Sequence, residues 1–194
     1  PTGMDALTHA LESYTNLLAN PVSDGLALQA IRLIGENLRL ACANDHELGA
    51  TENMLIASML AGMAFSQPRL GNVHAMSHPV GAQFGVHHGL ANAILLPHVM
   101  EFNLTARLGK FAIVAAALGA DTTGLDEREA AQAAVDVVRG MNADLGIPTK
   151  LGDVGVKKNG IRPMAKAAML SGNIPVNPRK TSQSDLETIF QQAI

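Results

Sequence analysis

Two short stretches of this sequence gather the residue types that bind divalent transition metals. Asp5 and His9 lie four residues apart in T-G-M-D-A-L-T-H-A-L-E, a spacing that places both side chains on one face of a helix. The second stretch is L-G-N-V-H-A-M-S-H-P-V-G-A-Q-F-G-V-H-H-G-L-A-N-A. Its histidines are His74, His78, His87 and His88. One carboxylate and three imidazoles make a full set of ligands, so the two stretches together predict a metal site.

Spacing alone leaves the choice among these histidines open. His74 and His78 share a helix face, but H-A-M-S-H lacks the glutamate of the zinc-protease motif H-E-x-x-H. Adjacent residues on a helix point about 100° apart, so only one of His87 and His88 should reach a given ion. An Asp near a helix N-terminus also has a structural use, since it complements the helix dipole. Crowded buried histidines each need hydrogen-bond partners, and this cost favours the metal interpretation.

Composition excludes several classes of protein. Hydrophobic residues make up 47% of the 194 residues and aromatic residues 3%, which favours closely packed helices over an aromatic-rich sandwich. The net charge is -3, with no basic stripe, so we expect no nucleic-acid partner. Cys42 is the only cysteine, which excludes an internal disulfide and fits a cytoplasmic protein. The longest runs of apolar residues are too short to span a bilayer, so we expect no membrane association.

The apolar residues recur with a helical period through almost the whole chain, and the fold class is predicted to be all-α. We expect a single bundle-like helical domain over residues 1–194. The predicted helices span residues 4–18, 23–43, 47–65, 73–84, 89–103, 105–118, 126–145, 161–170 and 184–193. Ser23 is the expected N-cap of the second helix. On the third helix the residues expected to face inward are Met54, Leu55, Met59, Leu60 and Met63.

The motifs resemble those of the iron-containing (group III) alcohol dehydrogenases over essentially the whole chain. The resemblance rests on T-G-M-D-A-L-T-H-A-L-E-S-Y, A-G-M-A-F, G-N-V-H-A-M-S-H-P-V-G-A, V-H-H-G-L-A-N-A-I-L-L-P-H-V-M-E-F-N and N-P-R-K-T-S. It implies the helical C-terminal half of a two-domain, dehydroquinate synthase-like fold. The N-terminal dinucleotide-binding domain is expected to be absent, because the sequence contains neither G-x-G-x-x-G nor G-G-G-S. The chain opens directly on Pro1-Thr2-Gly3 and a helix, and we expect it to be part of a longer polypeptide.

The same resemblance implies a role for particular residues. The family's metal ligands fall here on Asp5, His9, His74 and His88. It thereby selects His74 over His78 and His88 over His87. His78 is then a non-ligand beside the site and our candidate for the catalytic proton relay, while Phe65 and Leu70 are expected to line the substrate pocket.

The implied activity is the interconversion of a primary or other small alcohol and its aldehyde or ketone. Fe²⁺ is the expected ion, Zn²⁺ would suit the same ligands, and NAD(P) would bind through the missing domain. The fragment alone is therefore expected to be inactive, and the intact enzyme is expected to be a homo-oligomer. One alternative is a noncatalytic helical module with a structural metal. A maleylacetate reductase-like or other metal-dependent enzyme is another, although a metal phosphohydrolase would need a His-Asp dipeptide, which is absent.

Overall fold

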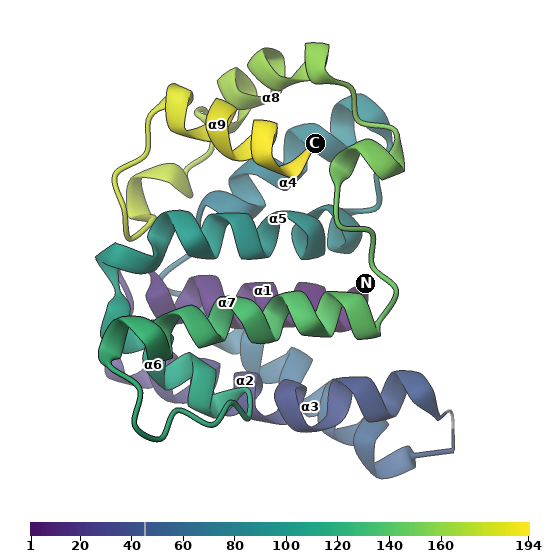
Figure 1. Cartoon of the computed structure of the whole chain (residues 1–194), viewed down its shortest axis with the longest axis vertical. Coiled ribbons are helices and arrows are strands. Elements are labelled where there is room, and N and C mark those ends of the chain that lie inside the picture. The colour runs from purple at the N-terminus through teal and green to yellow at the C-terminus, as the bar shows by residue number, and fades with distance from the viewer. Residues whose placement is uncertain (45) are drawn as a thin grey trace.

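Every regular element in the described part of the chain is helical, as the sequence predicts (Figure 1). The structure is a computed structural model that describes residues 1–44 and 46–194. Over these residues it contains nine α-helices, four short 3-10 helices and no strand. The α-helices are α1 (Thr2–Thr15), α2 (Pro21–Ala43), α3 (Leu48–Phe65), α4 (Asn72–Phe84), α5 (His88–Asn103), α6 (Leu108–Ala117), α7 (Glu127–Asp144), α8 (Ile161–Ala168) and α9 (Gln183–Ala193). The 3-10 helices are η1 (Leu104–Ala106), η2 (Leu151–Val154), η3 (Lys158–Gly160) and η4 (Ile174–Val176).

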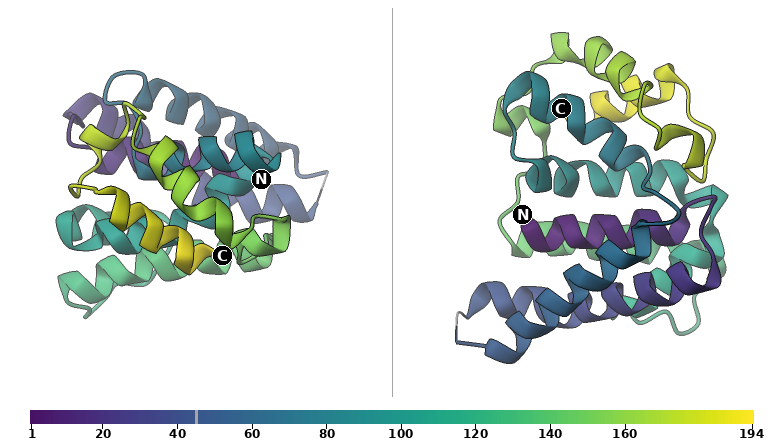
Figure 2. Two further views of the ribbon diagram at one scale, coloured as in Figure 1. Left: turned by 90° about the horizontal axis from the view of Figure 1, so that it is seen from above. Right: turned by 180° about the vertical axis from the view of Figure 1, so that it is seen from behind.

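Helix α1 lies in the middle of the molecule and brings together the two stretches of the sequence that carry the predicted ligands. It packs against α2, α3, α5 and α6, while α4 packs against α5 and α8. In Figure 1 the pair α2–α3 lies at one end and α8–α9 at the other, and the view from behind in Figure 2 shows the same order. The first turn of α4 is joined to α1 by hydrogen bonds from the Val73 and His74 amides to Glu12, and α5 packs on α1, with Gly89 next to Asp5.

The helix termini follow sequence signals, with one correction. Asn20, not Ser23, is the N-cap of α2, because the Asn20 side chain accepts hydrogen bonds from the amides of Val22 and Ser23. Ser23 lies in the first turn, where its hydroxyl accepts a hydrogen bond from the Asn20 amide. This reciprocal pair is a capping box, and Pro21 adds a first helical residue that needs no amide partner. The prediction of Ser23 as the N-cap was wrong, because Asn20 and Ser23 are both residue types that commonly cap helices and the sequence does not choose between them.

Small residues allow the helices to approach closely. At Gly35 in α2, a Cβ atom would lie 3.0 Å from the Cα of Leu118, so any larger residue would push α2 away from the end of α6. Larger side chains fill the space around α1, where Met4, Leu7 and Leu11 are buried. Close packing of this kind leaves little freedom in the helix positions, because a change of even one methylene in the interior is felt.

The predicted interior face of α3 is wrong for most of its large residues. Leu55, Met59 and Met63 are 69%, 57% and 52% exposed. The buried residues of α3 are small: Ala50, Ala57, Ala61 and Ala64. The helix is apolar on all sides, so its periodicity cannot say which side faces α1 and α2, and the alanines permit the closer approach.

Helix α3 is long and apolar enough to span a membrane, although the uninterrupted apolar runs of the sequence are shorter than a bilayer requires. Its mean hydropathy is 1.2 over 18 residues, enough by length and composition alone to cross a membrane, and 22% of that window is buried. Core helices of globular proteins meet the same criterion. Here α3 packs along α2 and also contacts α1.

Candidate metal centre

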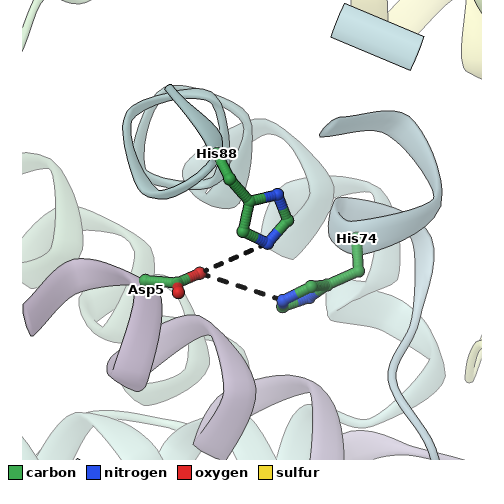
Figure 3. Close-up of side chains that lie close together, drawn as sticks. All are labelled: Asp5, His74 and His88. Atoms are coloured by element: carbon green, nitrogen blue, oxygen red, sulfur yellow. Dashed lines mark ion pairs between the residues drawn. The ribbon is translucent and has the colours of Figure 1, made fainter. Parts of the chain in front are cut away.

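Asp5, His74 and His88 point toward one another from three different helices (Figure 3). Oδ1 of Asp5 lies 3.9 Å from Nε2 of His74 and 3.7 Å from Nε2 of His88, and one ligand atom from each residue lies within 4.8 Å of the others. Two ligands bound at about 2.1 Å to one ion are roughly 3–3.5 Å apart. The three donor atoms therefore need to move only slightly to share a cation.

His9 is the fourth member of the cluster. Its Nε2 lies 3.1 Å from Nε2 of His74, and its Nδ1 lies 2.8 Å from the carbonyl oxygen of Asp5. A carbonyl only accepts hydrogen bonds, so Nδ1 of His9 carries the proton and Nε2 presents a lone pair to the centre. The pKa of His9 is lowered, first by burial and then by the neighbouring His74 ring, which favours the neutral form that binds metals.

The hydrogen-bond partners of the two inner histidines indicate which ring nitrogens face the centre. Nδ1 of His74 lies 2.7 Å from a carboxylate oxygen of Glu12, which also only accepts, so Nε2 of a neutral His74 ring is unprotonated. The lone pairs of His9 and His74 then face each other across 3.1 Å, with the Asp5 carboxylate beside them. Several acceptors directed at one point repel one another unless a cation or a hydrogen-bond donor lies between them. The donor set therefore fits a divalent transition metal such as iron or zinc.

Asn92 contributes the amide hydrogens that lie among these acceptors, and the sequence analysis did not identify it. Its Nδ2 lies 2.6 Å from Oδ1 of Asp5, 3.0 Å from Nε2 of His88 and 3.2 Å from Nε2 of His74. Two amide hydrogens cannot serve three acceptors at once, and Oδ1 of Asn92 is buried without a partner. Its position four residues after His88, on the same helix face, was the signal that could have identified it.

Glu12 is the second residue of the centre that the sequence analysis missed. It follows His9 by three residues and Asp5 by seven, so all three lie on one face of α1. Its side chain is 5% exposed and contacts His74, which is 2% exposed. The helical spacing was again the available signal.

His78 and His87 lie at the edge of the centre. His78 is exposed, one turn after His74 on α4, and its ring stacks on that of His88 with centroids 5.5 Å apart. Its pKa is lowered by partial desolvation of the ring and then by His74. His87 is exposed at the N-cap position of α5.

The two residues expected in a substrate pocket occupy different environments. Phe65, at the end of α3, is half-buried and stacks on the His9 ring with centroids 4.7 Å apart. Leu70 is also half-buried, and its carbonyl accepts a hydrogen bond from the Asn16 side chain at 2.8 Å. Phe65 thus covers one side of the His9 ring, whereas the hydrogen bond of Leu70 is made by its backbone.

The comparisons with known proteins agree with one another. A family model described as the Fe-containing alcohol dehydrogenase family, C-terminal, matches residues 1–194. The 1,3-propanediol dehydrogenase of Citrobacter freundii is 50% identical over 192 residues, 99% of this chain and 50% of that protein. The NAD-dependent methanol dehydrogenase of Bacillus methanolicus is 40% identical over 193 residues, 100% of this chain and 51% of that protein.

A solved structure of a 1,3-propanediol oxidoreductase superposes with a TM-score of 0.98 at 49% identity, covering 100% of this chain and 50% of that one. The chain therefore spans about half the length of the relatives it matches. The all-α architecture predicted from the sequence is confirmed by this likeness and by the helices themselves.

A histidine outside the centre provides a test of stability against pH. Burial lowers the pKa of His98, and the positive charge of Arg139 lowers it further. Above the ordinary value of 6.5, the ring is neutral in both the folded and unfolded chain, so it does not affect stability. As the pH falls below 6.5, the unfolded chain takes up the proton first, and stability decreases. Thermal unfolding of the chelator-treated chain between about pH 5 and 8 should show a smaller loss in His98→Gln than in the wild type. An identical loss in both proteins would contradict the assignment.

Proposed function

The chain belongs to the Fe-containing alcohol dehydrogenase family, and we propose that it is the metal-binding half of an NAD-dependent enzyme that interconverts a small primary alcohol and its aldehyde. The observation that carries the proposal is the convergence of three imidazole nitrogens and one carboxylate oxygen from α1, α4 and α5. We assign the ligands as Asp5, His9, His74 and His88. Fe²⁺ is the proposed ion because of the family, and Zn²⁺ would suit the same donors.

The proposed centre is open on one side, as a catalytic metal site requires. The side chains of Asp5, His9 and His88 are 26%, 20% and 40% exposed, whereas His74 is 2% exposed. Four protein ligands leave room for a substrate oxygen, and the bound cation would act there as a Lewis acid. A structural site is instead closed by its protein ligands, so the exposure favours catalysis over a noncatalytic module.

The remaining roles belong to side chains around the centre. Phe65 covers one face of the His9 ring, and its apolar surface would exclude water from that side and contact the carbon atoms of the alcohol. Leu70 is proposed to extend the same wall. His78 is exposed and stacks on His88, so its ring can exchange a proton with solvent and pass it toward the substrate hydroxyl.

The nucleotide is proposed to bind outside these 194 residues. The relatives are about twice as long, and one of them is named as NAD-dependent. Hydride transfer requires the nicotinamide to reach the alcohol carbon, and the exposed side of the centre is where it can do so. We further propose that the intact enzyme is a cytoplasmic homo-oligomer acting on small alcohols, in line with the small-alcohol names of its relatives.

The ligand assignment is tested by removing the most buried imidazole. The chelator-treated wild-type chain, equilibrated anaerobically with Fe²⁺ or with Zn²⁺, should retain about one ion per chain. His74→Ala should retain essentially none, because the remaining donors cannot close around the ion. Elemental analysis after gel filtration measures the stoichiometry, and His98→Gln, a histidine variant outside the centre, should bind like the wild type. Tight binding by His74→Ala would refute the ligand set.

The relay role of His78 is tested by separating metal binding from turnover. His78→Ala should keep the metal, since this residue is not a proposed ligand, and should slow turnover of the full-length enzyme by about 100-fold or more with a changed pH profile. The matched control is His87→Ala, which removes the other exposed histidine of the same region. If His78→Ala loses the metal as His74→Ala does, the two assignments are reversed.

If NAD(H) binds outside these 194 residues, the 194-residue chain alone should be catalytically inactive. It should bind metal yet show negligible affinity for NAD(H) and no oxidation of propanediol or other small alcohols. Fluorescence titration of NADH and a standard absorbance assay measure both quantities. Clear dehydrogenase activity from residues 1–194 would refute the proposal that the nucleotide binds outside this chain.

A further inference from the structure

Glu12 is a buried carboxylate with three hydrogen-bond donors, all from the first turn of α4. Its Oε1 accepts from the amide of Val73 at 2.6 Å, and its Oε2 lies 2.7 Å from Nδ1 of His74 and 3.4 Å from the His74 amide. The side chain is 5% exposed. Burying a carboxylate is costly unless it is hydrogen-bonded, and these three donors offset the cost for Glu12.

The burial of the Glu12 carboxylate is explained in part by the start of α4, whose first amides need hydrogen-bond acceptors. Its N-cap is Gly71, which has no side chain to accept the first helical amide hydrogens. Glu12 accepts them from another helix, and its negative charge complements the positive end of the α4 dipole. A Cβ at position 71 would lie 2.9 Å from Oε1 of Glu12, so glycine is needed for this approach. The same carboxylate thus caps α4 and contacts the ring of a proposed ligand.

We propose that Glu12 is a positioning residue that keeps the proton of His74 on Nδ1, so that Nε2 stays free to bind the metal. The inference rests on the proposed metal centre. A carboxylate accepts but does not donate, so the nitrogen that faces it must carry hydrogen. His74 is 2% exposed, and water cannot take over this task. Carboxylates that orient metal-binding histidines also make the ring a stronger donor.

Glu12→Gln tests the role with little change of shape. The glutamine oxygen can still accept from the Val73 amide, which turns its NH₂ group toward Nδ1 of His74. That nitrogen must then accept, the ring proton moves to Nε2, and the metal-facing position is blocked. Cobalt(II) titration of the chelator-treated chain, followed by its visible absorption, should show an affinity about 10- to 100-fold lower than in the wild type.

Asn177→Ala separates this role from helix capping. Oδ1 of Asn177 accepts the amide of Asn72 at 3.2 Å, at the same end of α4, and the other hydrogen bonds of this side chain go to Asn103, Arg179 and Thr181 and not to the His74 ring. The variant should lower the melting temperature yet leave cobalt affinity within about threefold of the wild type. If both variants lose affinity in proportion to their loss of stability, Glu12 is only a cap and the proposal is overturned.

The tautomer itself can be observed without metal. Long-range ¹⁵N–¹H spectra of the histidine-labelled, metal-free chain at about pH 8 should show Nδ1 of His74 protonated in the wild type and unprotonated in Glu12→Gln. An unprotonated Nδ1 in the wild type overturns the proposal, even if Glu12→Gln fails to fold. A wild-type chain that binds no cobalt would refute the metal centre instead, and the spectra would still decide the role of Glu12.

Discussion

The structure depends on one unusual feature of α1, namely a polar stripe on a helix in the middle of the molecule. Asp5, His9 and Glu12 lie on one face, while Met4, Leu7 and Leu11 are buried among the apolar residues. A carboxylate buried without partners would destabilise the fold by several kcal/mol, so each polar group on the stripe needs a fixed partner. These partners come from α4 and α5, and meeting that need sets where the two helices begin.

The start of α4 is held from two sides by residues distant in the sequence. Glu12 accepts the amides of Val73 and His74, and Asn177 accepts the amide of Asn72. Asn177 also exchanges hydrogen bonds with Asn103, at the end of α5. Asn177 of the C-terminal segment therefore helps to hold the start of α4. Asn177 is the first residue of the N-P-R-K-T-S motif, so this motif is joined to the start of α4 by a hydrogen bond.

Much of the fold could be predicted because helical period and capping residues are local signals. The limits of α4 and α5 were predicted to within one residue, and the interior of α3 was wrong because an apolar helix has no preferred face. At the site, spacing brought Asp5 and His9 onto one face but could not rank His74 against His78. The structure separates them by burial, since His74 lies in the interior and His78 is exposed. Glu12 and Asn92 were missed because the contacts that show their roles, with His74 and Asp5, are made between helices, and helical spacing alone did not single them out.

Charge balance would link the Glu12 carboxylate on one side of His74 to a cation bound on the other side of the ring. Asp5 and Glu12 together bring two negative charges to one side of α1, and the His9 and His88 rings tend to stay neutral because burial lowers the pKa of both. A divalent cation among the donors would bring the local sum to zero, with each carboxylate separated from it by at most one imidazole ring. Opposite charges at such short distances in a partly dehydrated interior attract strongly, and the attraction offsets the cost of burying Glu12. The carboxylate proposed to fix the His74 tautomer would thus also be a counter-charge for a bound metal, so that the position of α4, the proton on His74 and the affinity of the proposed centre would depend on the same side chain.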